Sequence, residues 1–176
     1  MKSQIPLPPA PDVDATRAVV VEVSDTQSHL KTDRHALDQL VRFVLRAEGV
    51  ERAAISLAIV DDATIRTLNR RHLEHDWPTD VISFLYTEPD DLALSGELVI
   101  SAETALAVST AAGVSPFGEL ALYVVHGLLH LLGHDDTTDD ARIAMRRRET
   151  ELLKALDLGD AFAAVDSIDA QGRFNR

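Results

Sequence analysis

Two histidines, His126 and His130, stand four positions apart in the run HGLLHLLGHDD at residues 126–136. An α-helix has 3.6 residues per turn, so a helix through this run places both imidazoles on one face, where they can reach a single ion. Two core histidines with ordinary hydrogen bonds are the alternative. A neutral imidazole carries a donor and an acceptor, and leaving them unpaired in an apolar helix costs roughly a few kcal/mol. A divalent metal satisfies one nitrogen of each ring, so the pair predicts a metal site.

The residues after His130 offer a third ligand. Gly133 is expected to end the helix in a left-handed turn, which lets a side chain of the sequence His134-Asp135-Asp136 fold back toward the pair. The pattern H-x-x-x-H-x-x-G-x-x-D has the spacing of metzincin proteases, with Asp where His is more usual. Those proteases use a Glu after the first His as general base, and Gly127 stands there. A peptidase of that kind is therefore disfavoured.

The composition limits which other chemistry is available. The chain has 176 residues and no cysteine, so thiolate catalysis, disulfides and cysteine-based zinc sites are excluded. Acidic residues outnumber basic ones by 29 to 17, giving a formal charge of −12 that disfavours non-specific nucleic-acid binding. No stretch has the ~20 apolar residues of a membrane span, and the N-terminus does not resemble a signal peptide. We expect a cytoplasmic protein in a reducing compartment, with no membrane partner.

The elements that position the histidines follow from apolar periodicity and capping residues. The proline-rich residues 1–16 predict a disordered lead-in, residues 17–158 a single domain and residues 159–176 a loosely ordered tail. The fold class that we predict is α+β, a mixed sheet of about four strands surrounded by about five helices. The strands are predicted at 18–23, 54–60, 81–86 and 97–101, and the helices at 32–49, 62–72, 102–113, 115–133 and 138–156.

The predicted helix at 115–133 carries the histidine pair. Ser115 followed by Pro116 is an N-cap with proline at the first helical position. The apolar residues of this helix point in every direction, which predicts that the helix is buried at the centre of the fold. Because the helix carries the histidine pair, the metal site is expected on this buried central helix. The other N-caps are expected at Thr32, at Asp61 or Asp62, and at Thr138 or Asp139.

Basic residues gather in two places against the acidic mean. One group is Arg66, Arg70 and Arg71 with His72 and His75, and the other is Arg142 with 146–148. Taken without neighbouring motifs, both groups are typical of solvated helix faces.

Three sequence blocks together resemble one family. They are HGLLHLLGHDD at 126–136, LNRRHLEHDWPTDVISF at 68–84 and GELVIS at 96–101. In this order they are similar to the motifs of the YbeY family of bacterial metal-dependent endoribonucleases and rRNA maturation factors, over roughly residues 19–158.

The resemblance implies a ligand set and a departure from it. The first two metal ligands fall on His126 and His130, and the family's third histidine falls on Asp136, with His134 as the alternative. Two imidazoles and one carboxylate suit one divalent metal, with Zn²⁺ as the expected ion. An arginine that many members carry falls on Leu73, and Arg70 and Arg71 are close enough in sequence to take over its role.

The expected activity is single-strand-specific, metal-dependent cleavage of RNA in rRNA processing and maturation and in ribosome quality control. Arg70 and Arg71 would stabilise phosphate charge, and Asp135 or Glu97 would act as base. Thr79, Asp80 and Ser83 either support the site or cap a turn and strand. RNA is the expected partner, with ribosomal proteins as further candidates. The alternatives are a non-catalytic ribosome-assembly factor with a structural metal and a metallohydrolase of another substrate.

Overall fold

The computed structural model describes residues 19–158, so the predicted lead-in at 1–16 and tail at 159–176 lie outside it. The described chain is an α+β fold of four strands and five helices, as the sequence predicts. The strands are β1 (Val19–Asp25), β2 (Ala53–Val60), β3 (Val81–Leu85) and β4 (Leu94–Ser101). The helices are α1 (Arg34–Ala47), α2 (Asp62–His72), α3 (Ala102–Ala112), α4 (Pro116–Leu131) and α5 (Asp139–Ala155). None of these helices is long and apolar enough to cross a membrane.

The four strands form one mixed sheet in the order β1-β2-β4-β3. Strands β1, β2 and β4 are parallel, while β3 pairs antiparallel with β4 and forms one edge. The register places Ser83 opposite Leu98 and Phe84 opposite Glu97. Because side chains alternate between the two faces, neighbours along β3 or β4 point to opposite sides of the sheet.

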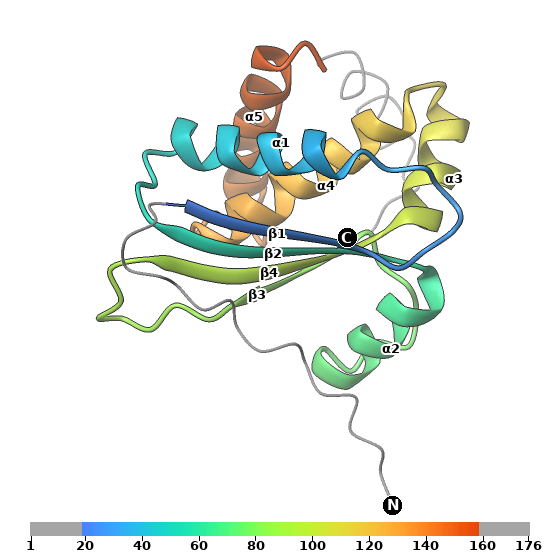
Figure 1. Ribbon diagram of the computed structural model, residues 1–176, viewed down its shortest axis with the longest axis horizontal. Helices are drawn as coiled ribbons and strands as arrows, with labels where there is room; N and C mark the ends of the chain where they lie inside the picture. The colour runs from blue at the N-terminus through green and yellow to red at the C-terminus, as the bar shows by residue number, and fades with distance from the viewer. Residues whose placement is uncertain (1–18, 159–176) are drawn as a thin grey trace, which may run out of the picture.

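Helices cover the two faces unequally (Figure 1). Helices α1, α3, α4 and α5 lie on one side. There α1 and α4 pack on inward side chains of all four strands in a large apolar core. Of the helices in residues 19–158, α2 alone lies on the other side, where Ile65 packs with Val60, Ile82 and Val99 in a smaller cluster. Leu98 and Ile100 of β4 belong to the large core on the α4 side. Because side chains alternate along a strand, the odd-numbered residues of β4 face the α2 side.

Helix α4 runs through the middle of the helical layer (Figure 1). Its N-cap is Ser115, whose hydroxyl accepts a hydrogen bond from the Gly118 amide, with Pro116 at the helix start as predicted. The helix is buried nearly all round, which its uniformly apolar sequence indicates. It ends at Leu131, and Gly133 follows in the left-handed region with φ 88°. The chain can therefore reverse direction directly after His130.

Two glycines let α4 approach the sheet closely. A Cβ on Gly127 would lie 2.8 Å from Leu98 Cδ2 and 3.1 Å from Ser83 Oγ. A Cβ on Gly96 of β4 would lie 2.8 Å from Leu131 Cδ1 and 3.0 Å from a backbone oxygen. Gly127 thus faces the sheet with no room for a side chain, so a glutamate base of the metzincin kind does not fit there.

Several predicted boundaries differ from the structure by one to three residues, among them the end of β1 at Asp25, and three of the differences have a clear physical reason. The N-cap of α1 is Asp33 and not Thr32, because the Asp33 carboxylate accepts the Ala36 amide at 3.0 Å. Strand β4 begins at Leu94 and not at 97, because residues 94–96 pair with β2 although their sequence, Leu-Ser-Gly, has weak strand propensity. Helix α4 ends at Leu131, two residues before Gly133, since the glycine lies outside the helix it terminates.

Candidate metal centre

His126, His130 and Asp136 form one cluster in which a ligand atom of each residue lies within 4.8 Å of the others. The two histidines come from consecutive turns of α4, and Asp136 comes from the loop that leads to α5. The structure therefore brings together the three residues that the sequence assigns to the metal.

The two imidazoles point their Nε2 atoms at each other across 3.0 Å. The Nδ1 of His126 lies 2.6 Å from Glu149 Oε1, and the Nδ1 of His130 lies 3.1 Å from the His134 carbonyl oxygen. A carbonyl oxygen and an ionised carboxylate only accept, so with Glu149 ionised these contacts select the tautomers in which each Nδ1 carries the proton and donates. Each Nε2 is then left with a lone pair, and two facing lone pairs at this distance are stabilised by a proton or a metal ion between or beside them. Two nitrogens at about 2.0–2.1 Å from one tetrahedral zinc ion are roughly 3.3 Å apart, close to the observed separation.

Asp136 completes a set of two imidazoles and one carboxylate. Its Oδ2 lies 3.8 Å from His130 Nε2, and its side chain is 29% exposed. His130 is 30% exposed, whereas His126 is nearly buried. The donor set fits a divalent metal, and the solvent-facing side leaves space for a further ligand.

The surroundings of His130 keep its imidazole neutral. Burial lowers its pKa, and the neighbouring His126 lowers it further, while Asp136, the His134 carbonyl and Glu149 act in the opposite direction. A metal ligand must be deprotonated at the coordinating nitrogen, so a lowered pKa favours binding at neutral pH.

Glu149 is a functional residue that the sequence reasoning missed. It projects from α5, is 2% exposed, and accepts the proton-bearing Nδ1 of His126. A carboxylate in this position fixes the tautomer of a ligating histidine and raises its basicity. The available signal was a charged residue on the otherwise apolar stripe of the last helix, because a buried carboxylate requires a partner.

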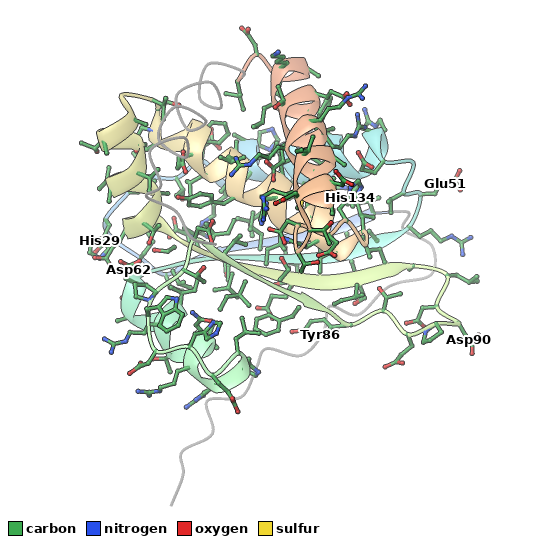
Figure 2. The ribbon with its side chains drawn as sticks, turned by 180° about the vertical axis from the view of Figure 1, so that it is seen from behind. His29, Glu51, Asp62, Tyr86, Asp90 and His134 are labelled. Carbon is green, nitrogen blue, oxygen red and sulfur yellow. The ribbon has the colours of Figure 1, made fainter. Side chains whose placement is uncertain are left out.

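The alternative third ligand, His134, turns away from the cluster. Its Nε2 lies 3.9 Å from Glu48 Oε2 at the end of α1, and only its backbone carbonyl faces the site. Figure 2 shows His134 beside α5 within the helical layer. This placement favours Asp136 as the third ligand.

Asp135 is held within its own loop. Its carboxylate accepts hydrogen bonds from the Asp136 amide at 2.8 Å and from the amide and hydroxyl of Thr137 at 3.1 and 2.6 Å. The bonds from Thr137 are the main reason that the pKa of Asp135 is lowered. A fully hydrogen-bonded carboxylate with a lowered pKa is a weak proton acceptor, so these contacts favour a role in shaping the loop that carries Asp136.

Glu97, the other base considered, faces the opposite side of the sheet. Its Oε2 accepts the Tyr86 hydroxyl at 2.8 Å. Burial raises the pKa of both groups, although the hydrogen bond from Tyr86 lowers that of Glu97. Figure 2 shows Tyr86 on the other side of the sheet from His134. Glu97 is thus separated from the histidines by the sheet itself.

The polar residues at the start of β3 make local contacts. The Thr79 hydroxyl and the Val81 amide donate to the Asp80 carboxylate. Thr79 and Asp80 therefore cap the turn that leads into β3, which is one of the two roles expected from the sequence. Ser83 differs, since its hydroxyl donates to the Gly127 carbonyl at 3.2 Å and so ties the edge strand to α4.

Arg70 and Arg71 belong to α2, on the sheet face opposite α4 (Figure 1). Arg70 Nη1 lies 3.7 Å from Asp76 Oδ1, and both residues are largely exposed. Leu73, where the resemblance places an arginine, is the C-cap of α2 and is 51% exposed. The structure therefore does not bring these arginines into the cluster of His126, His130 and Asp136.

Comparison with known proteins gives consistent matches. A family model described as Endoribonuclease YbeY matches residues 21–157. A relative from Rhodopirellula baltica named Endoribonuclease YbeY is 46% identical over 131 residues, which are 73% of this chain and 67% of the relative. One of the same name from Carboxydothermus hydrogenoformans is 37% identical over 142 residues, 79% of this chain and 99% of the relative. The solution structure of a Thermotoga maritima protein, 18% identical, matches with a TM-score of 0.55 over 81% of this chain and 95% of that chain, a likeness in fold alone.

Proposed function

The chain belongs to the YbeY family, and from this premise we propose that it is a metal-dependent endoribonuclease of single-stranded RNA acting in rRNA processing and maturation. The observation that carries the proposal is the pair of imidazole Nε2 atoms that face each other at 3.0 Å, each with its Nδ1 already donating to an oxygen. Both relatives described above are named as endoribonucleases, which supports RNA as the substrate.

We assign His126, His130 and Asp136 as the residues that would hold the metal, with Zn²⁺ as the expected ion. When bound, such an ion would supply Lewis acidity for the hydrolysis of a phosphodiester. Glu149 and the His134 carbonyl orient the two rings, so that neither imidazole has to reorganise when the ion binds. Asp135 holds the loop that presents Asp136.

Arg70 and Arg71 are assigned to the phosphate backbone of the RNA. Guanidinium groups bind phosphate through charge-assisted hydrogen bonds, and both side chains are exposed. Their place on α2, across the sheet from α4, supports substrate binding rather than contact with the reacting phosphate. Ribosome quality control, contacts with ribosomal proteins and a cytoplasmic location follow as expectations from this function.

One observation favours a second function, a non-catalytic ribosome-assembly factor with a structural metal. Leu73 takes the place of an arginine found in many members of the family, and nothing cationic replaces it at that position. A structural zinc site, however, is usually closed by four protein ligands. The cluster among residues 19–158 has three, and two of its side chains are about 30% exposed, which favours the catalytic proposal.

The proposal is tested with the purified full chain and an unstructured rRNA fragment. We expect cleavage by the metal-loaded protein, loss of cleavage after chelation and recovery when Zn²⁺ is added back. His130→Ala should be inactive, whereas Leu92→Ala should cleave normally, because Leu92 is an 84% exposed residue of the β3–β4 connection. A metal-loaded protein that leaves RNA intact would favour the assembly function.

A further inference from the structure

The only tryptophan of the chain, Trp77, lies on the surface in the loop between α2 and β3. It is 57% exposed, although tryptophan is usually among the more buried residues. His75 stacks against one face of the indole, with ring centroids 4.5 Å apart and an interplanar angle of 14°. The indole is thus more than half exposed even though His75 stacks against one of its faces.

A buried asparagine holds the aromatic pair in place. Asn69 is 2% exposed, and its side-chain amide donates to the Trp77 carbonyl at 2.9 Å. The Asn69 carbonyl accepts the amides of Leu73 at 2.9 Å and His75 at 3.4 Å. The first part of the loop and the backbone at Trp77 are therefore fastened to α2, so little backbone entropy is lost when a ligand stacks on Trp77.

Two arginines of α2 reach Asp76, the residue between His75 and Trp77 in the sequence. Arg66 and Arg70 both approach the single carboxylate of Asp76, at 3.0 and 3.7 Å, so one guanidinium charge there is not compensated by that carboxylate. Arg71 follows Arg70 on α2, and its side chain is exposed. We call the surface formed by Arg70, Arg71, His75 and Trp77 the Trp77 platform.

The second basic group of the chain does not share this character. On α5, Arg142 pairs with Asp139, Arg147 with Glu151, and Arg148 with Glu48 and Glu151. The arginines of α5 therefore form a solvated helix face with compensated charges, which is the structure expected from the sequence for both basic groups. On α2 the same interpretation does not explain an exposed, preorganised aromatic stack among the arginines.

We propose that the Trp77 platform is a binding site for single-stranded RNA, in which one base stacks on the exposed indole of Trp77 while Arg70 and Arg71 bind adjacent phosphates. Unpaired bases stack on aromatic side chains in this way, whereas bases inside a duplex expose no face. Arg66, Arg70 and Arg71 outnumber Glu74 and Asp76 of the following loop by one, so this surface is slightly basic in a protein whose net charge is −12. A slightly basic surface with an exposed aromatic ring fits a single strand. The proposal rests on the proposed function for the identity of the substrate and adds a subsite at the α2 end of the molecule, away from α4 (Figure 1).

Intrinsic fluorescence tests the proposal directly, because Trp77 is the sole tryptophan. The probe is a single-stranded DNA of about twelve nucleotides, within the usual length of a single-strand site. It is not a substrate of an endoribonuclease, and it has the same bases and phosphates as the corresponding RNA. We expect saturable quenching of the metal-loaded full chain by this probe, and no comparable quenching by the corresponding duplex.

Variants separate the roles of the ring and the charges. Trp77→Ala should weaken binding of the probe about tenfold or more, measured by anisotropy of a labelled oligonucleotide, and Trp77→Phe should retain most of the affinity. Arg70→Ala combined with Arg71→Ala should reduce the dependence of affinity on salt. Leu92→Ala is the matched control, because it also removes an exposed apolar side chain but at the β3–β4 connection. It should bind as the wild type does.

The outcomes keep this proposal apart from the proposed function. On cleavable RNA, Trp77→Ala should raise KM about tenfold and leave kcat and metal content near wild type. A Trp77→Ala protein that binds the probe as tightly as the wild type, or quenching equal for single strand and duplex, would overturn the platform even if RNA cleavage is robust. Conversely, quenching and a Trp77 effect in a protein that does not cleave RNA would support the platform and count against the endoribonuclease function.

Discussion

Replacing Glu149 with glutamine should weaken metal binding about tenfold without unfolding the protein. The two side chains have nearly the same shape, and the amide oxygen of glutamine can still accept the Nδ1 proton of His126. What is lost is the negative charge of a side chain that is 2% exposed and lies 2.6 Å from that nitrogen in the native protein. Hydrogen bonds to charged groups contribute about 1.5–3 kcal/mol, and changes in such partners of metal-binding histidines cost about 10–100-fold in affinity. Tenfold, or about 1.4 kcal/mol, is expected for Glu149→Gln, which keeps the orientation of the ring.

Glu149→Ala removes orientation as well as charge, so its loss should be about a hundredfold. Zinc affinity is measured by competition with a chromophoric chelator, for the wild type and both variants. Glu151→Gln is the matched control, since Glu151 is on the same helix but is 45% exposed and pairs with Arg147 and Arg148. If Glu149→Gln binds zinc as tightly as the wild type and the control, the argument that Glu149 fixes a ligating imidazole is wrong.

Three further predictions concern the same site and its support. Gly127→Ala should lower the free energy of unfolding by about 1–3 kcal/mol in denaturant titrations, because the added Cβ would meet Leu98 at 2.8 Å; an unchanged stability would show that α4 can move away from the sheet. Asp136→Ala should weaken zinc binding strongly and Asp136→His should tighten it, whereas His134→Ala should have a much smaller effect; the reverse order would make His134 the third ligand. In the metal-free protein the folded-state pKa of His130 lies below its ordinary 6.5, so the unfolded state binds the proton more readily. The contribution of His130 to the free energy of unfolding is therefore complete above about pH 6.5 and is lost as the pH falls below that value. Chemical denaturation between pH 7.5 and 5 should show a smaller loss of stability in His130→Gln than in the wild type. An equal loss of stability in the two proteins would refute this assignment.

Most of the fold could be predicted because its elements have strong local patterns. The stripe Leu37, Leu40, Val41, Val44 and Leu45 identified α1, and the uniformly apolar residues of 120–132 identified α4 as central. The order β1-β2-β4-β3 was not predictable, since strand pairing depends on contacts between segments distant in sequence. The start of β4 was missed for a related reason, because pairing with β2 extends the strand through residues whose own propensity is weak.

The candidate site shows the same division between local and distant information. Helical spacing alone placed His126 and His130 on one face, and the αL turn at Gly133 brings Asp136 back toward them. Sequence reasoning could not find that Glu149, 23 residues further on, accepts the Nδ1 proton of His126. Nor could it exclude Glu97, which alternates onto the face of β4 away from α4. The roles of Asp135, Arg70 and Arg71 remain predictions to be tested by substitution.

The metal content of the purified full chain tests the central claim most directly. Elemental analysis is expected to find close to one equivalent of a divalent metal per chain in the wild type, and close to none in His126→Ala and His130→Ala purified in parallel. The reason is that the two facing Nε2 atoms supply two of the three proposed ligands. A wild-type protein that remains empty after incubation with Zn²⁺, or single-histidine variants that keep a full equivalent, would contradict the account.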